Sequence, residues 1–141
     1  MLSDLYKLRR EHAELAEIVG RLSAVIGNPH PPAMSELFTL RHELSFALIA
    51  HLKAEDWVLY PRLFASTDPK VAQTASEFAF EMGGLADAYV DYADKWNAHS
   101  IEQDWSGYCA ETRCVIEALT TRITRENREL YPMLEAVSKA A

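Results

Sequence analysis

The chain has 141 residues, a length that fits one domain with a sizeable apolar core. Its formal net charge of −7 argues against a nucleic-acid partner or an anionic membrane surface, since both select basic proteins. No run of apolar residues is long enough to cross a membrane, and the first twenty residues are too charged for a signal peptide, so we expect neither segment.

The two cysteines, Cys109 and Cys114, are five residues apart in a segment with a helical pattern. On one helix their Cα atoms would lie about 7.5 Å apart along the axis, which is too far for a mutual disulfide. Two reduced thiols are typical of a cytoplasmic protein, so we expect a cytoplasmic location and a structural role for both residues.

The apolar residues of every long segment recur with a period near 3.6, which predicts helices and no strands. The first helix is expected over residues 3–26, and the turn-forming residues 27–32 end it. The second helix is expected to begin with Ser35 as its N-cap. It should bend or end at Pro61, because proline has no backbone N–H to donate.

The third helix is expected to begin with Asp68 as a cap and Pro69 at the first helical position. Gly83 and Gly84 fall inside the apolar pattern of this helix. Glycines lower helix propensity, and here they could admit a neighbouring helix at close range.

Ser100 with Gln103 resembles a capping box that would open the fourth helix. The sequence thus contains four amphipathic helices joined by short loops. This pattern predicts an all-α fold, an up-down-up-down antiparallel four-helix bundle, formed by residues 1–141 as a single domain.

An internal repeat is the most informative feature of the sequence. Residues 51–63 contain a glutamate followed by Leu-Tyr-Pro, and residues 122–134 repeat both elements at the same spacing. The leading residue differs, because the first segment begins with His51 and the second with Arg122.

The remaining helices also align with each other, since a shift of 70 residues places His12 of the first helix on Met82 of the third. The chain is therefore interpreted as two related helical hairpins. Each apolar stripe carries one anomalous residue at a similar height, and these residues are His12, His51, Met82 and Arg122.

Polar residues on apolar stripes are costly to bury unless they are paired or bind an ion. His51 and Glu55 are spaced i and i+4, so they lie on one face of a helix and can bind the same ion. His12 and Glu126 are expected at the same level of the bundle. Because histidine nitrogens and carboxylate oxygens suit iron, manganese or zinc, the sequence predicts a metal site formed by these four residues.

These signatures resemble the haemerythrin-like (HHE cation-binding) family, and the resemblance covers essentially the whole chain. It implies a helical bundle in which histidines from all four helices bind a non-haem di-iron centre, with two bridging carboxylates. It assigns His12, His51, Glu55 and Glu126 as metal ligands. It also implies sensing or handling of oxygen, nitric oxide, peroxide or iron, and no turnover of an organic substrate.

The sequence departs from the family pattern at two ligand positions. The third-helix histidine falls on Met82 and the fourth-helix histidine on Arg122, and in the family these two serve the same iron. We therefore expect one retained metal ion, mononuclear iron before zinc or manganese. Arg122 could supply the missing positive charge to Glu55 and Glu126 through its planar guanidinium. Glu81, beside Met82, is a candidate substitute ligand whose expected direction flanks the stripe.

The sequence leaves two interpretations open. In the first, the bundle binds one ion and has a sensing or iron-handling role; it is not expected to be an enzyme, although a mononuclear non-haem iron activity stays open. In the second, no metal binds, and Arg122 pairs with Glu55 and Glu126 in a buried network within an interaction module. Either could act through a protein partner or a homodimer.

Other conspicuous residues are expected to lie outside the site. His42 is nine residues before His51, about 180° round a helix, so its side chain should point away. Trp57, Tyr60 and Tyr131 are expected to pack at the end of the bundle.

Overall fold

The computed structural model describes residues 2–140, and these residues form helices and no strand, as the sequence predicts. The first and last residues of the predicted domain lie outside this part of the chain. In chain order the elements are α1 (Leu2–Ile26), α2 (Met34–Ala54), η1 (Glu55–Leu59), α3 (Tyr60–Phe64), α4 (Pro69–Met82), α5 (Leu85–Lys95), α6 (Ala98–Gln103), α7 (Trp105–Arg125), η2 (Glu126–Leu130) and α8 (Tyr131–Ala140), where η marks a π-helix.

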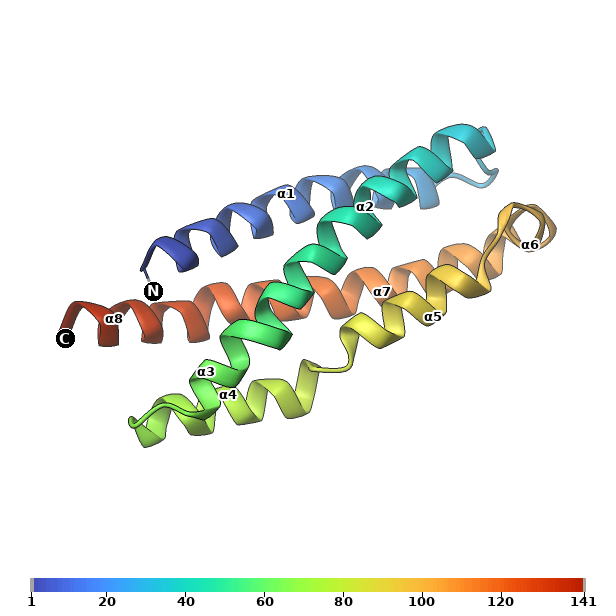
Figure 1. Cartoon of the computed structure of the whole chain (residues 1–141). Coiled ribbons are helices and arrows are strands. Elements are labelled where there is room, and N and C mark those ends of the chain that lie inside the picture. The colour runs from blue at the N-terminus through green and yellow to red at the C-terminus, as the bar shows by residue number, and fades with distance from the viewer. Residues whose placement is uncertain (1, 141) are drawn as a thin grey trace.

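The elements join into long rods (Figure 1). α2, η1 and α3 follow one another without a break, and so do α7, η2 and α8. Helix α1 contacts α2, α7 and α8, while α3 contacts α4 and α5 contacts α7. Within the described residues, no helix combines the length and the apolar composition needed to cross a lipid bilayer.

The N-cap of α2 lies two residues before Ser35, the predicted cap. Ala33 occupies the N-cap, with extended backbone (φ −55°, ψ 135°) and no capping side-chain bond. The N–H groups of Glu36 and Leu37 donate to the Ala33 carbonyl oxygen. Ser35 therefore lies inside the first turn, because the extended Pro-rich segment already ends at Ala33.

The predicted capping box at Ser100 and Gln103 is wrong. The reciprocal bonds join Asn97 to Ser100 and open the short α6, with each backbone N–H donating to the other side chain at 2.9 Å. α7 then begins separately with Asp104 as its cap, whose Oδ1 accepts from the Gly107 N–H at 2.9 Å.

The start of α4 agrees with the sequence, since Asp68 Oδ1 accepts from the Lys70 N–H at 3.0 Å. The predicted third helix is divided at Gly83 and Gly84 into α4 and α5. A Cβ at Gly83 would overlap the carbonyl oxygen of Ala79, whereas one at Gly84 would meet nothing within 4 Å. The glycines therefore interrupt this helix and do not admit a neighbouring one.

The two cysteines differ in burial. Cys109 is buried, Cys114 is exposed, and both are free. Neither lies among the buried polar residues described below, and the structural role expected for them stays a prediction.

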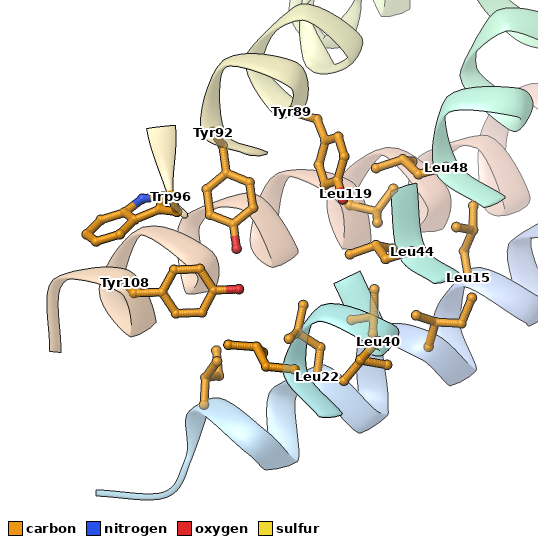
Figure 2. Close-up of a cluster of buried hydrophobic side chains, with 14 of the residues drawn as sticks. Leu15, Leu22, Leu40, Leu44, Leu48, Tyr89, Tyr92, Trp96, Tyr108 and Leu119 are labelled. Carbon is orange, nitrogen blue, oxygen red and sulfur yellow. The ribbon is translucent and has the colours of Figure 1, made fainter. Parts of the chain in front are cut away.

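The apolar core forms two clusters, a large one that includes Leu15 and Leu119 (Figure 2) and a small one that includes Leu8 and Leu130. On α1, His12 lies between Leu8 and Leu15, so a polar position separates the clusters along the helix. The same interruption occurs on the rod formed by α2, η1 and α3 and on the rod formed by α7, η2 and α8. The buried residues of this polar layer are His12, His51, Glu55, Arg122 and Glu126.

Candidate metal centre

The four predicted ligands come together in the polar layer. His12 lies on α1, His51 near the end of α2, Glu55 at the start of η1 and Glu126 at the start of η2. Each is at most 2% exposed, and one donor atom from each lies within 4.8 Å of the others. Since bonds from zinc to nitrogen and oxygen are about 2.1 Å long, the donors around one tetrahedral ion lie ~3.4 Å apart. A small closing movement would thus suffice to hold one ion.

Both imidazoles present Nε2 to the cluster because Nδ1 is engaged on the outer side. His51 Nδ1 lies 2.8 Å from Glu11 Oε1, and an ionised carboxylate only accepts, so the proton resides on Nδ1. Asn127 Oδ1 accepts from His12 Nδ1 at 2.7 Å. A donor bond of this kind fixes the tautomer of a metal-binding histidine.

At each of two contacts, an imidazole Nε2 and a carboxylate oxygen face each other, and both are hydrogen-bond acceptors. His51 Nε2 lies 3.0 Å from Glu55 Oε1, and His12 Nε2 lies 3.1 Å from Glu126 Oε1. When Nδ1 carries the proton of a neutral imidazole, Nε2 presents a lone pair, so a lone pair faces a carboxylate at each contact. His51 Nε2 and Glu126 Oε1 make no hydrogen bond within the described chain. A shared proton or a cation would relieve this repulsion, and the donor set therefore fits a metal ion.

Arg122 also contacts the two carboxylates. Its Nε is 3.3 Å from Glu126 Oε2, and its Nη2 is 3.3 Å from Glu55 Oε1, so the predicted pairing with both is present. Its shortest contact is from Nη2 to Asp56 Oδ1, at 2.6 Å. Nη1 also donates to the carbonyl oxygen of Met82 at 3.3 Å. Arg122 thus bridges four groups while only 2% exposed.

Two tyrosines assigned to packing in fact contact the site. Tyr131 OH donates to Glu55 Oε2 at 2.5 Å, and Tyr60 OH donates to Glu126 Oε2 at 2.8 Å. In a regular α-helix a residue five positions on is about 140° away, so the helical period concealed both. Each π-helix is closed by a backbone bond within its own segment: the Tyr60 N–H donates to the Glu55 carbonyl, and the Tyr131 N–H donates to the Glu126 carbonyl. This wide turn brings residues five apart to about one turn apart. Trp57 is 71% exposed and does not pack in the core.

Pro61 and Pro132 are the sequence signal for these wide turns. Each follows a tyrosine that closes a π-helix. A proline cannot donate to the preceding turn and its ring crowds the carbonyl there, and a wider turn accommodates both effects. Pro61 therefore does not end the second helix, which continues through α3 to Phe64.

Glu81, the candidate substitute ligand, lies outside the cluster. Its side chain is 49% exposed and pairs with Arg125 at the surface. Met82 is partly buried and packs against the small apolar cluster. His42 is exposed on α2, as predicted.

The charges of the layer influence one another. Burial opposes ionisation of Glu55, but the bonds and charges of His51 and Arg122 outweigh it and lower the pKa of Glu55 to about 2. Burial and the charge of Glu55 raise the pKa of Glu126 above its ordinary value. Burial lowers the pKa of His51, yet its carboxylate neighbours raise it overall. Glu55 therefore stays ionised, while His51 and Glu126 hold a proton up to a higher pH than usual when no cation neutralises the layer.

The family described as the hemerythrin HHE cation binding domain matches residues 3–134. The chain belongs to this family. The resemblance drawn from the sequence is thereby confirmed, and all four predicted ligands fall within the matched residues of the HHE domain. A search of curated proteins and a search of solved structures each found no match.

Family membership points to cation binding, and the HHE domain contains a His/Glu cluster that could hold a metal ion. Its outer partners, Glu11, Asp56 and Asn127, were not predicted. Each lies next to a residue of the polar layer in sequence but bonds to one on a different rod, so no single helix displays the pairing.

Proposed function

We propose that this HHE domain binds one non-haem metal ion, iron in the first instance, through His12, His51, Glu55 and Glu126. The observation that carries the proposal is the pair of inward Nε2 atoms, each held 3.0 or 3.1 Å from a carboxylate oxygen while its Nδ1 is engaged on the outer side. His51 Nε2 has no hydrogen-bond partner within the described chain, and His12 Nε2 has the Tyr131 hydroxyl at 3.3 Å. Zinc and manganese accept the same donor types, so they are the alternatives. The helical rods are inferred to form the up-down-up-down antiparallel four-helix bundle that the sequence predicts.

Arg122 supports one ion over two. Its guanidinium lies within 3.3 Å of both carboxylates. A second divalent ion there would face this buried positive charge at close range, which is unfavourable in a site with little water. Arg122 thus takes the place that a second cation would need.

The site suits a sensing or iron-handling role, without catalysis on an organic substrate. Its four ligands are at most 2% exposed, which suits a ligand of the size of O2, NO or peroxide better than a larger molecule. A change at the metal would then be passed to a protein partner or a second copy of the chain. We infer a cytoplasmic location from the two free thiols.

Metal analysis of protein purified without chelators tests the proposal, with anaerobic Fe²⁺ reconstitution as a second step. We expect about one ion per chain, none in Glu55→Ala, and an unchanged content in the control His42→Ala, which alters an exposed histidine. Two ions per chain would contradict the role given to Arg122. Equal metal content in both variants would contradict the ligand assignment.

A metal-free interaction module is the second candidate. The observation that favours it is the compensation of Glu55 and Glu126 by Arg122, which needs no ion. A protein that stays free of metal after reconstitution with Fe²⁺, Mn²⁺ or Zn²⁺ would establish this alternative.

A further inference from the structure

Each half of the repeat hydrogen-bonds the carboxylate of the other half. Tyr60 follows Glu55 in the chain but donates to Glu126, while Tyr131 follows Glu126 but donates to Glu55. In both cases the tyrosine reaches Oε2, and in both cases Oε1 faces an imidazole Nε2. Tyrosine and imidazole therefore contact different oxygens of each carboxylate. Arg122 adds a contact to Oε1 of Glu55 and to Oε2 of Glu126, each at 3.3 Å.

The tyrosines are held firmly enough to impose this division. Tyr60 is 4% exposed and Tyr131 is fully buried, and both belong to the small apolar cluster. The Tyr131 ring also stacks on His12, with ring centroids 5.1 Å apart and planes 15° apart. A buried phenol that lost its acceptor would be left unsatisfied, so each bond favours one carboxylate orientation.

We propose that Tyr60 and Tyr131 are positioning residues that make Glu55 and Glu126 each offer a single oxygen to the ion. This inference rests on the proposed function. A carboxylate whose second oxygen is bonded to a phenol cannot turn to bind an ion through both oxygens. The pair would thus favour ions that accept nitrogen donors and few oxygens over Ca²⁺, which takes six to eight oxygen ligands.

Buried tyrosines elsewhere in the chain provide a matched control. Tyr89 is 3% exposed, and its hydroxyl bonds to Ser45 at 2.7 Å. It lies in the large apolar cluster drawn in Figure 2, among leucines and other aromatic rings. Tyr89→Phe therefore removes a buried phenol hydroxyl without touching the polar layer.

The test uses Zn²⁺ affinity and the visible absorption of the Co²⁺-loaded protein, which weakens as the number of ligands rises. In Tyr60→Phe and in Tyr131→Phe we expect Zn²⁺ affinity to fall about 10- to 100-fold, the usual effect of removing an outer-shell bond. In Tyr131→Phe we also expect a weaker Co²⁺ absorption, because Oε2 of Glu55 is then freed and this carboxylate can bind through both oxygens. In Tyr60→Phe the Oε2 of Glu126 keeps its bond to Arg122, so a smaller spectral change is expected. Tyr89→Phe should keep the affinity and spectrum of the wild type.

The melting temperature of each metal-free variant shows whether it is folded. If one of Tyr60→Phe and Tyr131→Phe does not fold, the other is sufficient to test the inference. The inference is overturned if the two site variants keep the wild-type affinity and Co²⁺ spectrum, as Tyr89→Phe should. Wild-type protein that binds neither Zn²⁺ nor Co²⁺ would overturn the proposed function itself. The two failures are distinguished because the first occurs with metal bound and the second without it.

Discussion

Arg122→Met removes the positive charge of the polar layer while roughly keeping the length of the side chain. Arg122 is 2% exposed and contacts Glu55, Asp56 and Glu126 within 3.3 Å. Removing one partner of such a buried network leaves uncompensated charge and typically costs about 3–5 kcal/mol. An unfolding entropy of about 2.1 cal/mol/K per residue makes 1 kcal/mol equal to about 3.4 °C for a chain of 141 residues. The metal-free variant should therefore melt roughly 10–17 °C below the wild type.

Differential scanning calorimetry of the metal-free proteins measures this shift, and Arg21→Met is the control. Arg21 pairs with Glu17 and Glu43, but its side chain is 44% exposed. Surface pairs of this kind contribute little to stability, so the control should melt close to the wild type.

A divalent ion should restore part of the stability lost in Arg122→Met, because it supplies positive charge to Glu55 and Glu126. The rise in melting temperature on adding Zn²⁺ should therefore be larger in this variant than in the wild type. A metal-free variant that melts as close to the wild type as Arg21→Met does would refute the account of Arg122 as the compensating charge.

Three further outcomes are expected. Met82→His combined with Arg122→His should raise the metal content from one ion per chain to two, and an unchanged content would contradict the replacement of a cation by Arg122. Glu11→Ala should lower Zn²⁺ affinity about 10- to 100-fold because Glu11 fixes the His51 tautomer, while the exposed Glu14→Ala should not. Metal affinity should fall as the pH is lowered through the raised pKa of His51, because a proton then competes with the ion for Nε2; titrations at several pH values with constant affinity would contradict this.

The helical period was sufficient to predict the fold class, but it did not fix the helix starts. Near each start several side chains can cap, and each cap contributes only about 1 kcal/mol, so packing decides among them. Asp68 was predicted correctly, although Ser66 and Thr67 precede it, because Pro69 favours the first helical position and so marks the residue before it as the cap. Ser100 lies three residues from Asn97 and four from Asp104, both of which cap helices, and its predicted role was wrong.

The four candidate ligands were predictable because each lies on its apolar stripe at or before the residue where the regular helix ends. Glu55 and Glu126 are the first residues of η1 and η2, so the α-helical phase holds up to them. Beyond these residues the wide turn changes the phase, and the period places Tyr60 and Tyr131 on the wrong face. The repeated spacing of glutamate, tyrosine and proline was visible in the sequence, but its effect on the turn was not.

The charge arrangement of the layer supports the proposal of one ion within a fold built from two similar halves. Arg122 lies nearest to Asp56, at 2.6 Å, and farther from Glu55 and Glu126, at 3.3 Å. The single positive charge of Arg122 is therefore shared among three carboxylates. When all three are ionised, the layer retains two negative charges, which one divalent ion balances and two would exceed. Because one half contributes Glu55 and the other Glu126, the ion also joins the two halves, and binding should stabilise the whole domain.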